Sequence, residues 1–384
     1  MDSQRNTAVI TAECFCKSHK ISLEVSTSEL PLECDVCHCD SCRHSTGALC
    51  AIKTTWPQPR ESVDISGLQR YQFSANITYR FCGTCSTLMF YESVRYPSKL
   101  GVFYGPLKNI DIDLIKLTKH IYVYDTRDGG ASFWLRKPNA DGKEIPRYQQ
   151  QVSEDEEEEI DWDWPDIPSL WLGPGDRPLL VSCHCKGINL LLHRKYYFTK
   201  NREELPWFID PTTNTPIAGF TVSDPCNPYS SNEIINWVIV DLGIISQRNS
   251  RAFPRTTAEL KAAVDAGDST IGTLTYYQPS SDIQRYFCKV CSASAFYACS
   301  KRPKIVGVAM GILRGEVMGL KLNNTLGRAR AEEDLSWNFG DISTSLDDAT
   351  WGWRGRLIKR MQADAQEFIV SRQCCASTSS VAKD

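Results

Sequence analysis

Paired cysteines are the side chains of this chain best suited to chemistry. The sequence contains 17 cysteines, and several of them stand in C-x-C or C-x-x-C pairs. Cysteine thiolates bind zinc, and four of them complete its tetrahedral shell and leave no position open. One pair of each type, far apart in the sequence, supplies such a set: Cys14, Cys16, Cys82 and Cys85. We predict that these four residues hold a structural zinc ion, whose binding energy would contribute directly to folding.

A tighter cysteine cluster lies between these pairs, in the segment CDVCHCDSCRHSTG at 34–47. Its C-x-C-x-x-C core consists of Cys37, Cys39 and Cys42. Three thiolates leave the fourth position of a zinc ion free for water or for a substrate sulfur. A thiol bound there would become a thiolate, which is the nucleophilic form. We therefore predict a catalytic-type zinc site, and thiol chemistry, on these three residues.

Side chains next to this cluster leave several alternatives open. Cys34 lies three residues before Cys37 and could be a fourth ligand, which would close the site. His38 and His44 could also bind the metal, or could only support its ligands. Arg43 follows the cluster directly, and its planar guanidinium could bind a substrate carboxylate or form an ion pair within the loop.

The cysteine pairs recur in the second half of the chain. The segment YRFCGTCSTLMFY at 79–91 is echoed 206 residues later by RYFCKVCSASAFY at 285–297. Upstream, CFCK at 14–17 is echoed by CHCK at 183–186. Two echoes in the same order indicate two copies of one domain. The repeat predicts a second structural zinc site on four residues: Cys183, Cys185, Cys288 and Cys291.

The middle cluster is not repeated in the second copy. Aligning Cys226 with the third ligand of the first cluster places Thr221 and Ser223 where the other two ligands stand. Neutral hydroxyl groups are poor zinc ligands, and Asn227 takes the place of the arginine. We expect the second copy to have lost the open site and to serve as a scaffold, a lid or a wall of the substrate pocket.

Short β-strands are the elements expected to position these cysteines. Apolar or alternating runs rich in branched and aromatic residues favour strands. Four such runs stand out: ISLEV at 21–25, HIYVYD at 120–125, INLLLH at 188–193 and NWVIVDL at 236–242. We predict a mainly β protein made of two tandem zinc-binding β-domains with a few helices.

Two helices are predicted. The segment at 256–266 begins with Thr256 as a cap and carries Glu259 three positions later. The segment at 357–371 spaces its apolar residues helically near the C-terminus. We expect this last helix to pack on its own domain rather than to bind a partner.

The predicted domain boundaries follow from the repeat and from charge. Residues 8–135 form the first zinc β-domain, and residues 178–345 form the second, degenerate one. The run SEDEEEEIDWDWPD at 153–166 repels itself, so residues 136–177 are expected to be a solvated acidic linker. Residues 346–384 are expected to form the C-terminal helix and tail.

Composition excludes several classes of function. A net charge of −3 gives no general attraction to nucleic acid or to an anionic membrane, and no apolar run is long enough to span one. The N-terminal residues lack the pattern of a secretory signal, so we expect a cytoplasmic protein. In that reducing compartment the cysteine pairs favour metal over disulfides. The sequence does not indicate an oligomeric state.

Taken in order, the motifs resemble the glutathione-dependent formaldehyde-activating enzyme family, which includes centromere protein V. The resemblance rests on CFC at 14–16, CHCDSCRHSTG at 37–47 and FCGTC at 81–85. It covers residues 8–135 well and residues 178–340 loosely. The resemblance implies Mss4-like domains, a structural zinc on the outer four cysteines and a second zinc on the middle three. It also implies carbon–sulfur chemistry, in which glutathione adds to formaldehyde to give S-hydroxymethylglutathione.

These inferences lead to one main functional prediction and two alternatives. We predict a zinc-dependent carbon–sulfur lyase whose small-molecule partner is glutathione, another thiol or a thiol adduct. One alternative is a zinc module without enzymatic activity that binds another macromolecule. The other is a redox or metal sensor in which oxidation of the middle cluster expels the zinc.

Overall fold

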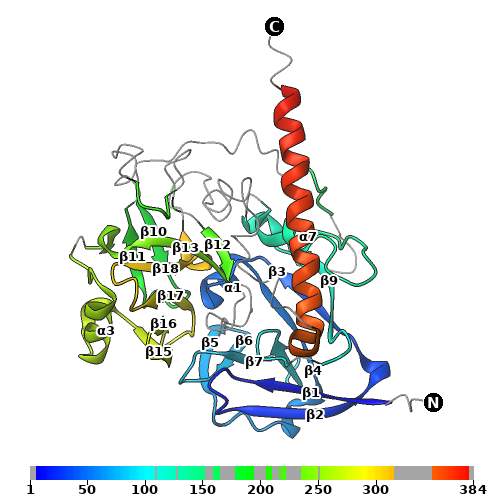
Figure 1. The fold of residues 1–384 in the computed structure, drawn as a ribbon. Coiled ribbons are helices and arrows are strands. Elements are labelled where there is room, and N and C mark those ends of the chain that lie inside the picture. Colours follow the sequence, from blue (N-terminus) through cyan, green and yellow to red (C-terminus); the bar gives the residue numbers. More distant parts are fainter. Residues whose placement is uncertain are drawn as a thin grey trace.

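The computed structural model describes residues 6–108, 110–126, 129–151, 159–164, 178–193, 205–209, 216, 218–221, 235–249, 251–314 and 348–379. The protein is mainly β, as predicted (Figure 1). We refer to the described residues up to 164 as the first half and to residues 178–314 as the second half. No helix in this part of the chain is long and apolar enough to cross a membrane.

The first half consists of a hairpin and a large sheet. The hairpin pairs β1 (Thr7–Glu13) with β2 (Lys20–Ser26). The seven-stranded sheet has the order β5-β6-β7-β8-β4-β3-β9, with β3 and β9 parallel and the other pairs antiparallel. Its strands are β3 (Leu32–Cys37), β4 (Ala51–Pro59), β5 (Gln69–Ser74), β6 (Ile77–Phe81), β7 (Leu88–Ser93), β8 (Lys99–Phe103) and β9 (Ile115–Ile121). Helix α1 (Asp40–Thr46) connects β3 to β4.

The second half contains two antiparallel sheets. A four-stranded sheet has the order β14-β11-β10-β19, and a six-stranded sheet has the order β12-β13-β18-β17-β16-β15. The first comprises β10 (Leu179–Ser182), β11 (Asn189–Leu192), β14 (Ile245–Gln247) and β19 (Leu313–Arg314). The second comprises β12 (Ala218–Thr221), β13 (Ile235–Asp241), β15 (Leu274–Ser280), β16 (Ile283–Cys288), β17 (Ser294–Cys299) and β18 (Ile305–Ala309).

The two large sheets have the same strand order and register. The run β15-β16-β17-β18-β13-β12 follows the same path as β5-β6-β7-β8-β4-β3. Tyr79 pairs with Tyr91 in the first sheet, and the residues 206 positions later, Arg285 and Tyr297, pair in the second. The turns that carry the C-x-x-C pairs also agree, because Ser86 and Ser292 both have a φ of 62°.

Three of the four predicted strand segments lie in strands, namely in β2, β11 and β13. The fourth, at 120–125, does not continue as a strand. Strand β9 ends at Ile121, and a 3-10 helix, η3 (Val123–Thr126), follows it. Tyr122 has a φ of 58°, a left-handed conformation that breaks the extended backbone.

Helix α3 (Thr257–Asp265) confirms the prediction of a capped helix. The hydroxyl of Thr256 accepts a hydrogen bond of 3.1 Å from the backbone N–H of Glu259. The carboxylate of Glu259 in turn accepts one of 2.7 Å from the backbone N–H of Arg255. Both contacts satisfy N–H groups that have no partner within the helix.

The C-terminal helix α7 (Asp348–Ser379) is longer than predicted and packs on the first half (Figure 1). It bends at Gly352, whose φ of 49° is not helical. The expectation that it packs on its own domain is wrong, because its contacts are made with residues of the first half. Arg356 forms an ion pair with Asp113, and α7 lies against the 3-10 helix η4 (Gly130–Leu135).

Part of the predicted acidic linker is packed rather than solvated. The guanidinium of Arg147 is fully buried over the ring of Trp162 and donates a 3.0 Å hydrogen bond to the carbonyl of Asp161. Ile160 is only 4% exposed. Residues 159–164 therefore belong to the packed first half, whereas residues 152–158, which hold most of the acidic run, lie outside the described part.

The buried apolar side chains of the two halves and of α7 form one connected core. This core contains Ile10 of the hairpin, Phe296 of the second half and Trp353 of α7. The halves are therefore held together by packing, and each one forms part of the surroundings of the other.

Candidate metal centres

Cysteine sulfurs gather at three places in the described part of the chain. Within each group the sulfur atoms lie within 4.8 Å of one another. The groups are Cys14, Cys16, Cys82 and Cys85; Cys183, Cys185, Cys288 and Cys291; and Cys37, Cys39 and Cys42. The structure thus brings together every predicted set of ligands, and each set could hold a metal ion.

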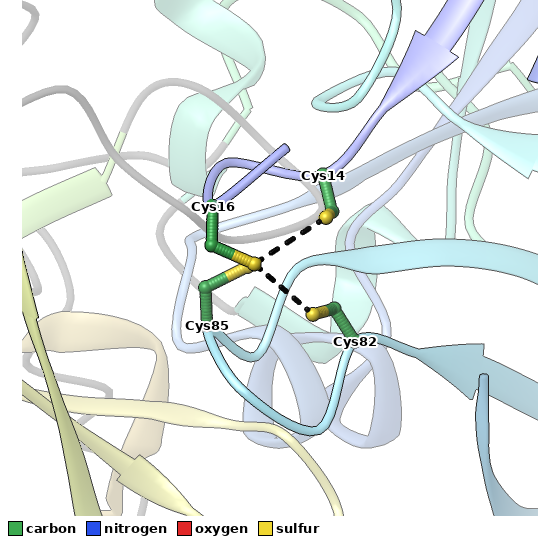
Figure 2. A group of neighbouring side chains, drawn as sticks. All are labelled: Cys14, Cys16, Cys82 and Cys85. Atoms are coloured by element: carbon green, nitrogen blue, oxygen red, sulfur yellow. Dashed lines mark hydrogen bonds between the residues drawn. The ribbon is translucent and has the colours of Figure 1, made fainter. Parts of the chain in front are cut away.

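The first four-cysteine group joins two segments that are far apart in the sequence. Figure 2 shows the loop after β1, which carries Cys14 and Cys16, facing the turn after β6, which carries Cys82 and Cys85. The sulfur of Cys16 lies 3.6 Å from that of Cys14 and 3.5 Å from that of Cys82. Four sulfurs at the zinc–sulfur distance of about 2.3 Å would lie about 3.8 Å apart, so this group fits a closed zinc site.

Hydrogen-bond donors surround these sulfurs. The backbone N–H of His19 points at the sulfur of Cys14 at 3.3 Å. The hydroxyl of Ser18 lies 3.0 Å from the sulfur of Cys16, and that of Thr87 lies 3.2 Å from the sulfur of Cys85. Four thiolates would carry more negative charge than one zinc ion neutralises, and these donors would stabilise the excess.

The second four-cysteine group has the same construction. The sulfur of Cys185 lies 3.5 Å from that of Cys183 and 3.4 Å from that of Cys288. The backbone N–H of Ile188 donates to the sulfur of Cys183 at 3.3 Å, just as that of His19 does in the first group. Lys17 and Lys186, which follow the two C-x-C pairs, have φ values of 64° and 63°.

The three-cysteine group lies at a strand-to-helix turn. Cys37 ends β3, Cys39 is the N-cap of α1, and Cys42 lies in the first turn of that helix. The sulfurs of Cys37 and Cys39 are 3.4 Å apart, and the backbone N–H of Cys42 donates to the sulfur of Cys39 at 3.3 Å. The C-x-C-x-x-C spacing therefore directs three sulfurs to one point.

Cys34 does not complete this group. Successive side chains of a strand point to opposite faces, so Cys34 and Cys37 lie on different faces of β3. Cys34 packs with Val36 in the main core, and its thiol lies 3.6 Å from the carbonyl oxygen of Leu32. Burial raises its pKa and keeps the thiol protonated. Among the described residues, no fourth cysteine, histidine or carboxylate ligand joins the three-sulfur group.

Two further side chains reach the three-cysteine group from other strands. The ammonium of Lys53, on β4, lies 3.4 Å from the sulfur of Cys42, and the hydroxyl of Tyr79, on β6, lies 3.8 Å from it. Hydrogen bonds with the Cys37 and Cys39 thiols, together with the charge of Lys53, hold the pKa of Cys42 well below its usual value. Burial alone would lower the pKa of Lys53, but the Cys42 thiolate raises it well above its usual value.

The histidines next to this cluster have structural contacts. The ring of His38 is fully buried, and its Nε2 lies 2.9 Å from Nδ1 of His120, whose Nε2 donates to the carbonyl of Leu135 at 3.0 Å. Burial lowers the pKa of His38 well below its usual value and that of His120 to about 3, so both rings are neutral. Neither His38 nor His44 belongs to a described metal group.

Arg43 lies inside the loop rather than beside its open side. Its side chain is 2% exposed and forms an ion pair with Asp40. Its Nε donates to the carbonyl of His38 at 3.1 Å, and one Nη donates to that of Asp125 at 3.3 Å. These contacts correspond to the loop ion pair that the sequence allowed, and contact with a substrate remains a prediction.

The strand registers equate Thr221 with Cys37. Thr221 is paired with Ile235 on β13 as Cys37 is paired with Ala51 on β4. The neighbouring strands agree with this. Lys53 pairs with Phe103 on β8, and Trp237 pairs with Ala309 on β18, which lies 206 positions after Phe103. The other residues of that alignment lie outside the described part of the chain: Ser223, Cys226 and Asn227.

The sequence pattern identifies the cysteines but gives no indication of Lys53 or His184. Local spacing carries no signal for Lys53, because β4 reaches the cluster through pairing with β3. Tyr79 and Phe73 appear in the sequence only as aromatic residues near the motif, and the structure places both beside the three-cysteine group.

One protein family matches part of the chain. Residues 9–125 match the family described as glutathione-dependent formaldehyde-activating enzyme. This stretch contains the first four-cysteine group and the whole three-cysteine group, and the match confirms the resemblance for this part of the sequence. No match was found among curated proteins or among solved structures.

Proposed function

We propose that this protein is a zinc-dependent enzyme that makes or breaks a carbon–sulfur bond in a glutathione adduct of the S-hydroxymethylglutathione type. The observation that carries the proposal is the three-cysteine group, which has no fourth protein ligand among the described residues and has the ammonium of Lys53 next to it. This group lies within the stretch that matches the family. Glutathione and its adducts are the substrates that this family's description suggests.

The donor set fits a catalytic zinc ion. Cys37, Cys39 and Cys42 would hold it, and zinc in this position would supply the Lewis acidity that keeps a substrate thiol deprotonated. The sulfur of glutathione attacks the carbonyl carbon of formaldehyde. A carbon–sulfur bond forms, the carbonyl π electrons move to oxygen, and that oxygen takes a proton from solvent. The reverse sequence breaks the bond and returns glutathione and the aldehyde.

Lys53 is assigned the task of balancing charge. Three thiolates and one zinc ion together carry one net negative charge, which disfavours the arrival of a further thiolate. The ammonium 3.4 Å from Cys42 offsets that charge. Tyr79 fills the space beside it and is fully buried, so it excludes water from this side of the group.

The two four-cysteine groups are assigned structural zinc ions. All four sulfurs of each group converge and no position is left open, which is the arrangement of a structural site. The matched strand order supports two copies of one domain, residues 8–135 and 178–345, with the C-terminal helix and tail at 346–384. We place the acidic linker between them, without residues 136–151 and 159–164, which pack in the first half.

The proposal is tested by following the exchange between glutathione, formaldehyde and S-hydroxymethylglutathione with carbon-13 NMR. We expect the zinc-loaded protein to accelerate the exchange above the uncatalysed rate, and the Cys39→Ser variant to lose the acceleration. Cys50→Ser is the matched control, because Cys50 is buried in the main core and outside every described metal group. Equal rates with and without protein would reject the enzymatic proposal for this substrate.

A sensor function has one observation in its favour. The sulfurs of Cys37 and Cys39 lie 3.4 Å apart, so they are near enough to form a disulfide once the metal is lost. Loss of about one zinc per chain under mild peroxide, restored by reductant and without any catalysed exchange, would support this function instead.

A further inference from the structure

The second half of the chain lies directly against the helix that carries Cys42. Helix α1 packs on the 3-10 helix η10 (Met310–Ile312), and α1 lies between the two halves in Figure 1. The backbone N–H of Gly311 donates a 2.9 Å hydrogen bond to the carbonyl of Gly47, the C-cap of α1. A Cβ on Gly47 would lie 2.5 Å from the carbonyl oxygen of Ser294. The two halves therefore meet backbone to backbone where α1 ends.

His184, in the second half, packs on Phe73, which in turn packs against the three-cysteine group. It stands between Cys183 and Cys185, and its backbone N–H donates to the carbonyl of His44 at 2.9 Å. Its ring stacks on Phe73 with centroids 4.7 Å apart and an interplanar angle of 18°. Its Nδ1 lies 2.5 Å from the hydroxyl of Tyr71.

A row of stacked rings connects His184 to Cys42. Phe73 stacks on Tyr79 with centroids 4.3 Å apart, and the hydroxyl of Tyr79 lies 3.8 Å from the sulfur of Cys42. Phe73 also packs against the small buried cluster that contains Cys37 and Cys42. The imidazole of His184 therefore stacks on Phe73, the ring that packs directly against the three-cysteine group.

One nitrogen of this imidazole is available to a ligand. The hydroxyl of Tyr71 occupies Nδ1, and in the tautomer in which that hydroxyl donates, the ring hydrogen lies on Nε2. Among the described residues Nε2 has no hydrogen-bond partner, and the side chain of His184 is only half-buried. The contact with Tyr71 thus holds the ring in place and leaves Nε2 available to a ligand.

The equivalent position in the first half, between the two cysteines of its C-x-C pair, carries a side chain of different chemistry. Phe15 stands between Cys14 and Cys16, and its ring meets Tyr277 edge-on at 5.7 Å and 82°. His184 meets Tyr71 at 5.7 Å and 87°. Phe15 has no polar atom, and it faces the half in which Thr221 stands at the position of the first cysteine ligand. Of these two equivalent residues, the polar one, His184, faces the half that holds the three-cysteine group.

We propose that the second half covers one side of the three-cysteine group and that His184 is a specificity-determining residue. Its Nε2 donates a hydrogen bond to a backbone or carboxylate oxygen of a peptide thiol. This inference rests on the proposed function, because it assumes that a substrate sulfur is bound at Cys37, Cys39 and Cys42. It assigns the degenerate half a direct part in recognition of the substrate. A thiol without a peptide backbone gains nothing from this hydrogen bond.

The test uses the full chain loaded with cobalt(II), whose absorption reports on the ligands at each site. Glutathione and ethanethiol are titrated separately, and metal content is measured on every variant. In His184→Phe the ring still stacks on Phe73, but the Nε2–H donor is lost. We expect the Kd for glutathione to rise about tenfold, as a lost hydrogen bond of about 1.4 kcal/mol requires, and the Kd for ethanethiol to stay unchanged.

Two further variants complete the experiment. His184→Gln keeps an N–H donor and is expected to recover most of the glutathione affinity. Phe15→His, the mirror exchange, is expected to bind both thiols as the unchanged protein does. Equal glutathione affinity in His184→Phe and the unchanged protein would overturn the inference, as would an equal loss for both thiols. An unchanged protein that shows no spectral response to any thiol would reject the proposed function itself.

Discussion

The ammonium of Lys53 is the residue-scale feature on which the proposed chemistry depends most. Its Nζ lies 3.4 Å from the sulfur of Cys42 and would offset the charge that three thiolates leave on a bound zinc ion. We predict that Lys53→Met weakens glutathione binding about tenfold or more, because a charged hydrogen bond contributes about 1.5–3 kcal/mol. Calorimetric titration of the zinc-loaded protein measures this.

Lys116→Met is the control for this prediction, since that lysine is exposed on β9. Metal content should remain the same in both variants. Unchanged glutathione affinity in Lys53→Met would show that the ammonium is only a packing neighbour of Cys42.

Arg43 gives a second prediction at the scale of single residues. Its buried guanidinium holds the loop through the carbonyls of His38 and Asp125 and through Asp40. We predict that Arg43→Ala lowers the free energy of unfolding by about 2–4 kcal/mol, because buried hydrogen-bonding groups are left without a partner. Denaturant titration measures this, with the exposed Arg70→Ala as control. Unchanged stability with weaker substrate binding would instead favour contact with a substrate.

The cysteine ligands could be predicted from the sequence because metal-binding pairs lie close together along the chain. Cys37, Cys39 and Cys42 are brought together by one local turn, so their spacing alone is informative. Lys53 and His184 reach the same place through strand pairing and through contact between the halves, and no local pattern records such contacts. Spacing also could not exclude Cys34 as a metal ligand. In the structure its side chain lies on the opposite face of β3 from that of Cys37.

At the scale of elements, helix α7 anchors the C-terminal region to the first half. Trp353 is 1% exposed, packs edge-on against Tyr104, and donates from its indole N–H to the carbonyl of Lys108 at 3.0 Å. Arg354 beside it donates to the carbonyl of Gly105 at 3.2 Å. We predict that Trp353→Ala costs about 3–5 kcal/mol of unfolding free energy, through lost burial and the cavity left behind.

Chemical denaturation of the full chain measures this loss. Lys359→Ala is the control, because that side chain lies on the exposed side of the same helix. A loss below about 1 kcal/mol in Trp353→Ala would mean that α7 is only loosely attached to the first half.

The attachment of α7 should also depend on pH through Asp364. Its carboxylate accepts a 2.6 Å hydrogen bond from the backbone N–H of Lys137, and burial raises the pKa of Asp364 to about 6. An acid whose pKa is raised on folding stabilises the fold below its ordinary pKa of about 3.9, and this contribution is lost as pH rises through 6. We predict that, as pH falls from 7 to 5, the unchanged protein gains unfolding free energy relative to Asp364→Asn.

Denaturant titrations of both proteins at pH 7, 6 and 5 test this prediction. Protonation of the cysteine groups affects the two proteins alike, so the difference between them isolates Asp364. A difference that stays constant across this range would contradict the role given to the carboxyl group.

Elements with a local signal could be predicted, whereas their packing partners could not. The cap formed by Thr256 defines the start of α3 in the sequence and in the structure. The end of β9 depends on the left-handed backbone of Tyr122, which no residue type at that position requires. The acidic run predicted a solvated linker, but Arg147 binds residues 159–164 through aromatic and carbonyl contacts that the charge pattern does not reveal.

At the scale of the whole molecule, one connected core joins two β-regions with the same strand order. Both regions keep a four-cysteine group, and among the described residues the three-cysteine group lies in the first half. The second half contributes backbone contacts and the ring of His184 to the surroundings of that group. The molecule therefore presents three cysteine groups that could hold metal ions, two with four sulfurs and one with three.

Zinc content per chain is the most direct measure of whether the three cysteine groups hold metal. It is measured on reduced, purified protein and on a triple variant with Cys37→Ser, Cys39→Ser and Cys42→Ser. We predict about three zinc ions in the unchanged protein and about two in the variant, from two closed sites and one open site. A content of about two in both proteins would contradict the central claim, because the three-cysteine group would then not be a zinc site.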